Sequence, residues 1–225
     1  MLLQRDVRWL WLVSVLPIAA CDLDLSFESD GTSVHATGRD DHSIDVSICA
    51  GPSGLLDCNQ DNDAFAVTAD GVTEQASAGF LSFGGLDATF DVNAADLAIT
   101  VTRQDGATGT VTLPPLFDLT GPSGPVARGD RVALAWQPGS TDAMTWTANV
   151  SCPSNGADSI SEPRTIADDG RLEISASELP KPGSGACSAS LALTRSRRGT
   201  MAAPYPSDST IAGEQTRAIA FELDD

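Results

Sequence analysis

The sequence predicts an all-β fold built from antiparallel β-sandwiches. Short stretches in which apolar and polar residues alternate recur along residues 22–225, and this period of two is typical of half-buried strands. Turn-forming residues separate the stretches, since the 225 residues include 20 Gly and 13 Pro, with pairs such as Asp70-Gly71 and Gly84-Gly85. No stretch sustains the roughly 3.6-residue spacing of an amphipathic helix. We therefore expect many short strands joined by tight turns.

The composition indicates a folded and strongly acidic protein. Hydrophobic residues make up 41% of the chain, which is enough to bury a core and argues against wholesale disorder. The formal net charge is −18, with 31 acidic against 13 basic residues, and the pI is about 4.1. Such a chain repels a phosphate backbone, and its Lys and Arg residues form no stripe interleaved with aromatics. We therefore exclude nucleic acid as a partner.

The first half of the mature chain contains roughly seven or eight expected strands. Pro114 and Pro115 follow the last of them, and a central strand cannot pass through two residues that lack the backbone N–H. We therefore place a domain boundary after residue 115. The clearest of these expected strands are Ile44–Ile48, Phe65–Val67, Leu81–Phe83, Ala88–Val92, Leu97–Val101 and Val111–Leu113.

The second half repeats the alternation and predicts a second sandwich. Each half has roughly 100 residues with short strands at regular spacing, which fits an immunoglobulin-like β-sandwich. The predicted organisation is a signal peptide at 1–20, a first sandwich domain at 21–115 and a second at 116–225. A single larger sandwich or jelly roll is the alternative. The expected strands here are Val132–Trp136, Met144–Cys152, Leu172–Ile174, Cys187–Leu193 and Ile219–Leu223.

The two tryptophans of the mature chain are expected in the core of the second sandwich. Trp136 and Trp146 share strand faces with Leu134 and Met144. Both precede Cys152, whereas in antibody domains a Trp lies between the two bridged cysteines. The term immunoglobulin-like therefore describes the architecture and not an antibody-type core.

The first residues of the chain predict a secretory signal peptide. Arg5 and Arg8 supply a basic start, and the segment from Trp9 to Ala20 is almost entirely apolar and ends in small residues. This segment is shorter than the about 20 apolar residues that a transmembrane helix needs. We therefore expect residues 1–20 to be removed during export.

The signal segment ends in the run Leu16-Pro17-Ile18-Ala19-Ala20-Cys21. This run resembles the lipobox of bacterial lipoproteins, in which an aliphatic residue and two small ones precede a Cys that becomes the acylated first residue. The resemblance implies that Cys21 carries acyl chains such as palmitate and holds the exported protein at a membrane, facing the periplasm or the cell surface. Cleavage removes two Arg and one Asp, so the net charge of −18 becomes −19. The alternative is an ordinary secreted protein in which Cys21 is a free thiol.

The remaining cysteines predict two disulfide bonds in an oxidising compartment. The chain has five cysteines, and setting Cys21 aside leaves four that can pair. Cys49 and Cys58 enclose a short loop rich in Gly, Pro and Ser, so we expect them to staple a hairpin. Cys152 ends one expected strand and Cys187 begins another, so a bond between them would join two strand ends.

Three longer runs carry a second resemblance, and they are Val111–Phe117, Val132–Pro138 and Leu191–Thr200. These runs look like segments of uncharacterised secreted bacterial lipoproteins with tandem immunoglobulin-like β-sandwich modules. The similarity extends over most of residues 90–223 and implies the same fold. No activity follows from it, because the shared runs are structural.

The residues that could carry catalysis are few. His35 and His42 are the two histidines, and neither has a Cys or a second His at metal-ligand spacing. Asp41, His42 and Ser43 are neighbours in sequence, so on a strand their side chains would point to opposite faces and form no triad. We therefore expect no enzymatic activity and assign no catalytic residue.

The loop around Cys58 contains the one candidate metal site. Asp57, Asn59, Asp61 and Asp63 place oxygen ligands at alternate positions, as a hard cation such as Ca²⁺ requires. The pattern is an incomplete EF-hand loop, because Thr68 stands at the twelfth position, where a bidentate Glu is needed. We interpret the loop as a solvated polar turn beside a disulfide, and expect no cofactor unless Ca²⁺ binds here.

Arg195, Arg197 and Arg198 form the basic cluster of this acidic chain. Arg195 and Arg197 fall on the same strand face as Leu191 and Leu193, so we expect them past the buried part of the strand, in a hairpin. There they would pair with acidic neighbours or contact a partner, and we favour the acidic neighbours.

These observations predict a non-enzymatic, membrane-anchored lipoprotein that acts as a binding or structural module in the cell envelope. Its partners are the membrane, through the lipid anchor, and an unknown protein or other envelope component. The alternative is an envelope enzyme or enzyme inhibitor whose site is built from loop carboxylates. A pocket with two or more acids of raised pKa would favour that alternative, whereas an open strand edge would favour a binding module.

Overall fold

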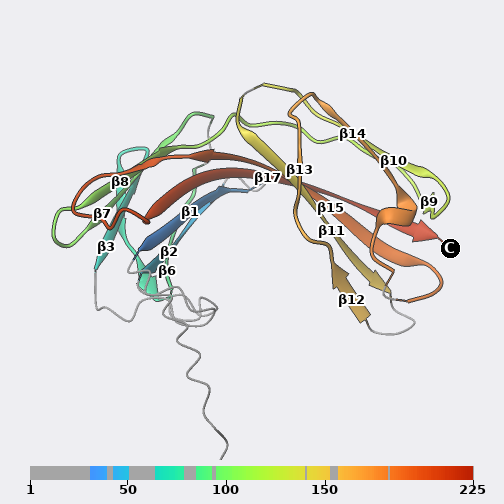
Figure 1. The fold of residues 1–225 in the computed structure, drawn as a ribbon, viewed down its shortest axis with the longest axis horizontal. Helices are drawn as coiled ribbons and strands as arrows, with labels where there is room; N and C mark the ends of the chain where they lie inside the picture. Colours follow the sequence, from blue (N-terminus) through green and yellow to red (C-terminus); the bar gives the residue numbers. More distant parts are fainter. Residues whose placement is uncertain are drawn as a thin grey trace, which may run out of the picture.

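The computed structural model describes residues 31–39, 43–50, 64–78, 85–92, 95–139, 141–152, 157–181 and 183–224 (Figure 1). Nearly all regular structure in this part of the chain is β-strand, and its one helical element is a single 3-10 turn, η1 (Ala176–Glu178). The predicted all-β fold is therefore confirmed.

The largest sheet extends along the whole molecule. It has 10 strands in the order β12-β11-β15-β17-β1-β2-β6-β5, with β13 pairing with β11 and β9 pairing with β17. Most neighbours are antiparallel, but β17 runs parallel to β1 and to β9. The strands of this sheet are β1 (Thr32–Gly38), β2 (Ile44–Ala50), β5 (Ser77–Ala78), β6 (Leu86–Phe90), β9 (Val126–Ala127), β11 (Ala143–Cys152), β12 (Ala157–Ile160), β13 (Arg164–Ile166), β15 (Cys187–Arg198) and β17 (Thr210–Asp224).

Two smaller sheets pack on the large one. The first has five strands, in the order β16 (Thr200–Met201), β8 (Thr108–Thr112), β7 (Ala98–Arg103), β3 (Phe65–Ala69) and β4 (Val72–Gln75). The second has two strands, β10 (Arg131–Ala135) and β14 (Arg171–Ser175). Each small sheet closes a sandwich with a different part of the large sheet, so the predicted pair of immunoglobulin-like sandwiches is present.

Each sandwich has its own hydrophobic core. Alternate residues of the strands point inward, as the sequence pattern predicts, and β11 shows this along its whole length. The first core includes Phe65, Val34 and Ile99, and the second includes Leu191 and both expected tryptophans, which are 6% and 3% exposed. Removing this apolar surface from water is the main favourable contribution to the stability of either half.

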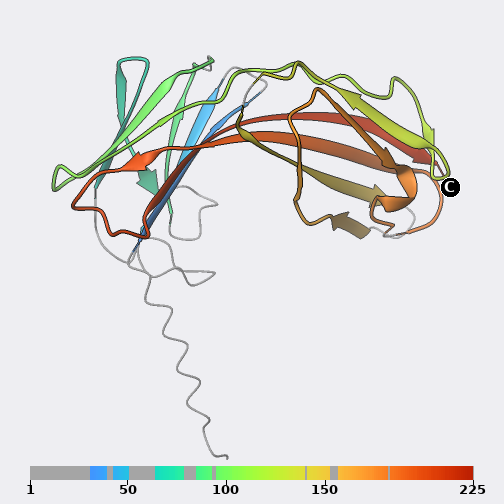
Figure 2. The ribbon, with the colours of Figure 1, turned by 45° about the horizontal axis from the view of Figure 1, so that its top comes forward.

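Two long strands connect the cores. β15 and β17 arch from one half of the molecule to the other and pair with each other along the way (Figures 1 and 2). Leu191 and Phe221 pack in the second core, whereas Ile211, at the start of β17, packs in the first. A rigid shared hairpin therefore replaces the flexible linker that usually separates tandem domains.

The tip of this hairpin completes the first sandwich. Gly199 leaves β15 so close to β8 that a Cβ there would run into the carbonyl oxygen of Thr110. The chain then forms β16 against β8, and Tyr205 enters the first core with 7% exposure. Within the expected second unit, residues 116–225, Tyr205 and Ile211 thus belong to the core of the first half.

We predict that Ile211→Ala destabilises both halves together. Ile211 is 2% exposed, and truncation of a buried Ile leaves a cavity that costs about 3 kcal/mol. Trp136 and Trp146 lie in the second core, so their fluorescence reports on that core, while far-UV circular dichroism reports on both. Urea unfolding should give one transition that coincides for the two probes and moves to lower urea for both in the variant.

Ile160→Ala is the matched control, because Ile160 is 71% exposed and its truncation should change stability by no more than about 0.5 kcal/mol. A fluorescence transition that stays in place while the dichroism transition moves would contradict the coupling of the two cores.

Candidate functional site

A buried ion pair lies where the two cores meet. The side chains of Arg195, on β15, and Asp168, in the β13–β14 connection, are 1% and 3% exposed, and Nη2 of Arg195 lies 3.0 Å from Oδ2 of Asp168. The guanidinium also donates to two backbone carbonyls, that of Pro115 at 3.0 Å and that of Gln137 at 3.0 Å. It therefore ties the connection between the halves to the second sandwich.

Asp168 is held in its ionised form. The indole Nε1 of Trp136 donates a 2.7 Å hydrogen bond to Oδ1 of Asp168, which also accepts from Arg195. Burial by itself would raise the pKa of this carboxyl, but the hydrogen bonds from Trp136 and Arg195 outweigh burial and lower it. The buried charge is thus compensated by Arg195 of β15 and by Trp136, the residue after β10.

Phe117 places an aromatic ring beside the same guanidinium. Cζ of Arg195 lies 4.8 Å from the ring centroid, and Cζ of Arg217, on β17, lies 5.9 Å from it. Both distances allow cation–π attraction, which is strongest where water is excluded. Phe117 lies two residues after Pro115, so this stacking fixes the start of the second half.

A second arginine joins the two halves nearer the surface. Arg197 donates to both carboxylate oxygens of Asp142 at 2.9 Å, to Asp96 at 3.2 Å and to the Leu113 carbonyl at 3.4 Å. Its hydrogen bonds with Asp142 raise the pKa of the guanidinium. Because Asp96 and Leu113 belong to the first half and Asp142 precedes β11, the bidentate pair spans the junction.

The predicted pairing of the basic cluster with acidic residues is confirmed for Arg195 and Arg197, but the predicted position of Arg195 is wrong. Strand alternation predicts Arg195 beyond the buried part of its strand, whereas Arg195 is 0% exposed. β15 continues into the first half, and a carboxylate far away in sequence supplies the partner. Strand alternation carries no signal for such a partner, so Asp168 and Asp142 were missed.

We predict that Asp168→Asn costs about 3 kcal/mol at pH 7, because it leaves the buried charge of Arg195 uncompensated. The pKa of Asp168 is lowered by folding, so its contribution is present above the ordinary value of 3.8 and is lost as the pH falls through the folded-state pKa. Urea midpoints of the two proteins should therefore differ at neutral pH and converge in acid. Asp118→Asn, at an exposed carboxylate, is the matched control, and an unchanged gap down to pH 2 would contradict the role of Asp168.

A disulfide closes the far end of the second core. Cys152 on β11 and Cys187 on β15 are bonded, with Cα atoms 4.3 Å apart and exposures of 0% and 1%. They follow the Ser151–Ser188 pair in the strand register, so the bond joins directly opposite positions. This predicted bond is confirmed. Cys49 is also disulfide-bonded, while its expected partner Cys58 lies outside the described residues, so that pairing stays a prediction.

We predict that the double variant Cys152→Ala/Cys187→Ala loses about 3.8 kcal/mol of unfolding free energy. The bond closes a loop with a sequence separation of 35, and the loop-entropy relation gives this value. Urea unfolding of the oxidised proteins measures the difference. A loss below about 1 kcal/mol would show that the strand pairing at this end holds without the bond.

Several predicted site residues lie outside the described part of the chain. They are the lipidation site Cys21, His42 and the candidate calcium ligands Asp57, Asn59, Asp61 and Asp63. Among the described residues, no group of three or more His, Cys, Asp or Glu side chains could hold a metal ion. Nor does any helix among them have the length and hydrophobicity to cross a membrane.

His35 has an acidic neighbour on the surface of the large sheet. Its Nδ1 lies 3.7 Å from Oε1 of Glu214, and the two side chains are 53% and 27% exposed. The hydrogen bond to Glu214 raises the pKa of His35. The pair lies on the outer face of the large sheet, across the β1–β17 ladder, where it adds a weak surface contact.

The surface carries open hollows next to strand edges. One of about 500 Å³ lies between β13 and β14 and is lined by Ile166, Ala167, Asp169, Arg171, Leu172 and Glu173. Another of about 350 Å³ lies between β4 and the end of β6, and its lining includes Asp70, Glu74 and Asp91. Both adjoin a strand that is paired on one side. This arrangement suits the binding of a partner along an edge.

The comparisons with known proteins concern the fold. No protein-family model matches the chain, and no curated protein matches it. Among solved structures, the FN1–FN3 domains of chicken CNTN1 are 9% identical, with 87% of this chain and 68% of that chain covered and a TM-score of 0.28. A segment of two fibronectin type-III domains from chicken tenascin is 8% identical, with 85% of this chain and 97% of that chain covered and a TM-score of 0.25. A mutant alpha-2-macroglobulin of Salmonella is 11% identical, with 84% of this chain and 14% of that chain covered and a TM-score of 0.29.

Proposed function

We propose that this protein is an exported, lipid-anchored, non-enzymatic module that holds a binding surface away from a bacterial membrane. The anchor would be Cys21, on the strength of the lipobox-like run Leu16–Cys21. The described fold supplies a rigid spacer, and the observation that carries the proposal is the passage of β17 through both cores.

The arrangement of the chain supports this orientation. The described residues begin at Gly31, and the N–H of Thr32 donates to the Ser209 hydroxyl, just before β17. β17 has 15 residues and runs from its pairing with β1 to its far end, where Leu223 lies opposite Cys187. At about 3.3 Å per residue this strand spans about 50 Å. A partner bound at the second sandwich would thus lie far from the anchored end.

The alternative, an enzyme or inhibitor with a carboxylate site, gains no specific support from the electrostatics. Hydrogen bonds from Arg103 lower the pKa of Asp105 to about 2, and those from Trp136 and Arg195 lower that of Asp168. Both carboxyls face a guanidinium and act as ion-pair partners. A general acid needs a shift in the opposite direction.

We predict that Cys21→Ser moves the protein from the membrane fraction to the soluble fraction of the producing cells. The serine hydroxyl cannot form the thioether that carries the lipid, so the multiple acyl chains that give stable anchoring are lost. Intact mass spectrometry of the wild type should show residues 21–225 plus acyl groups. The Cys152→Ala/Cys187→Ala variant is the control, since it should remain in the membrane fraction. A wild-type protein without acyl groups, or a Cys21→Ser variant that stays on the membrane, would overturn the anchor.

A further inference from the structure

β14 has a free edge. It pairs with β10, and no other described strand pairs with it. Ala135 exchanges both backbone hydrogen bonds with Thr120 on the other side of β10, so the Ala135–Arg171 pair is not a hydrogen-bonded one. Hydrogen bonds in an antiparallel ladder alternate, so Leu172 and Ile174 bond to β10, and the backbone groups of Arg171 and Glu173 point to the open side.

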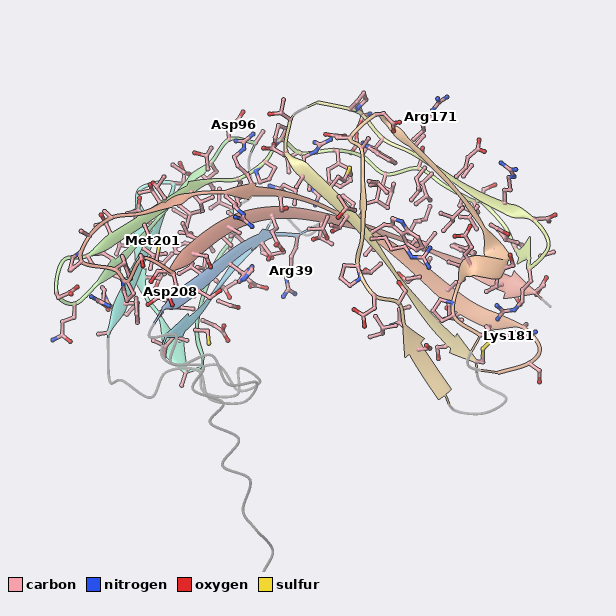
Figure 3. All side chains as sticks on the ribbon, viewed as in Figure 1. Arg39, Asp96, Arg171, Lys181, Met201 and Asp208 are labelled. Carbon is pink, nitrogen blue, oxygen red and sulfur yellow. A yellow bond between two sulfur atoms is a disulfide. The ribbon has the colours of Figure 1, made fainter. Side chains whose placement is uncertain are left out.

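The edge is protected at its two ends and accessible at its centre. Asp169 Oδ1 accepts from the Arg171 N–H at a long 3.3 Å, and Glu178 Oε1 accepts from the Ser175 N–H at 3.2 Å. Between them the hollow of about 500 Å³ runs along the strand, with Leu172 half-buried in its wall. Figure 3 shows the Arg171 side chain projecting from the outer surface of this half.

We propose that a second copy of this chain pairs with β14 at this edge, in an antiparallel two-fold arrangement. Arg171 of one copy lies opposite Glu173 of the other, and each such pair exchanges two backbone hydrogen bonds, in which the Glu173 carbonyl of the other copy replaces Asp169 Oδ1 as the acceptor of the Arg171 N–H. Leu172 lies opposite Leu172 of the other copy, which buries the half-exposed apolar side chain. The two-stranded sheets β10–β14 then become one continuous four-stranded sheet.

The charges on β14 complement those of a second copy of the same strand. The outward side chains of β14 alternate in sign, so the proposed register sets a cation opposite an anion twice. Glu173 also contacts Arg131 of β10 at 3.1 Å, an exposed pair that leaves the second carboxylate oxygen available. A register centred on Glu173 would set Glu173 of one copy against Glu173 of the other, and this repulsion between two carboxylates disfavours it.

The free edge of β4 shows why the same pairing fails elsewhere. β4 follows the Asp70-Gly71 turn, where both residues have positive φ, as a two-residue hairpin turn requires. At such a turn the flanking residues Ala69 and Val72 form a hydrogen-bonded pair, and the ladder then alternates. The backbone groups of Thr73 and Gln75 therefore point to the open side of β4. Two-fold pairing of these residues would set Glu74 directly against Glu74 of the other copy, in an acidic hollow. β4 is therefore the internal control for the proposed interface.

The test is sedimentation velocity of the mature chain carrying Cys21→Ser, at rising concentration. The wild-type edge should give a concentration-dependent dimer. Arg171→Glu and Glu173→Arg should each weaken it about tenfold, because each creates two like-charge pairs across the ladder. The double variant Arg171→Glu/Glu173→Arg should return association to near the wild-type level, since it restores both opposite pairs.

Two further variants separate backbone pairing from surface charge. Glu173→Pro removes an outward-facing N–H and should abolish the dimer, with the urea midpoint checking that the monomer is folded. Glu74→Arg makes the same charge change on β4 as Glu173→Arg makes on β14, and should leave the dimer unchanged.

A chain that stays monomeric at about 200 μM, above typical weak-dimer concentrations, would overturn the proposal. So would a dimer that all the β14 variants leave unaffected, or a double variant as weak as the singles. None of these results depends on acylation of Cys21, so the proposed anchor stands or falls separately.

Discussion

The guanidinium of Arg195 is buried in a place where an unpaired charge could not persist. Transfer of a cation into a protein interior costs several kcal/mol, and only close anionic and carbonyl partners offset that cost. Here the partners are Asp168 and the carbonyl oxygens of Pro115 and Gln137, which come from three separate segments. Those segments are thereby fixed relative to β15, and the two cores with them.

The long strands and the ion pair depend on each other. β15 and β17 can continue from one core to the next only if the layer between the cores is solvated or internally paired. Arg195 lies opposite Gln215 in the β15–β17 register, and both are 0% exposed. This polar layer is enclosed by the aromatic ring of Phe117 and by the Arg197–Asp142 pair. Two hydrophobic cores can therefore share one sheet without merging, which explains the elongated arrangement of the two halves in Figure 1.

Local sequence pattern predicts the strands well because each strand is decided by neighbours two residues apart. The alternation predicts most of β2, β3, β6, β7, β10, β11, β14 and β15, but only the end of β8 and the C-terminal part of β17. The Cys152–Cys187 bond followed from strand ends. The pattern is silent on pairing between distant segments. It could not show that β1 runs parallel to β17, or that Tyr205 belongs with Phe65. The predicted position of Arg195 was wrong for the same reason, since the acceptors of its hydrogen bonds come from distant segments and not from its own strand.

The distribution of strand edges links fold to function. An unpaired edge exposes backbone donors and acceptors, and proteins cover or charge such edges to avoid unwanted association. Here β16 covers β8, β9 covers the end of β17, and Glu74 charges the β4 edge. The β14 edge is treated differently, because its two acidic caps bracket a centre whose outward charges, Arg171 and Glu173, have opposite signs. Protection by like charge repels every copy of the chain, whereas alternating charge repels misaligned copies and attracts the aligned one. The β14 edge has the least protection at its centre, and it is also the edge whose alternating charges specify one register of pairing with a second copy.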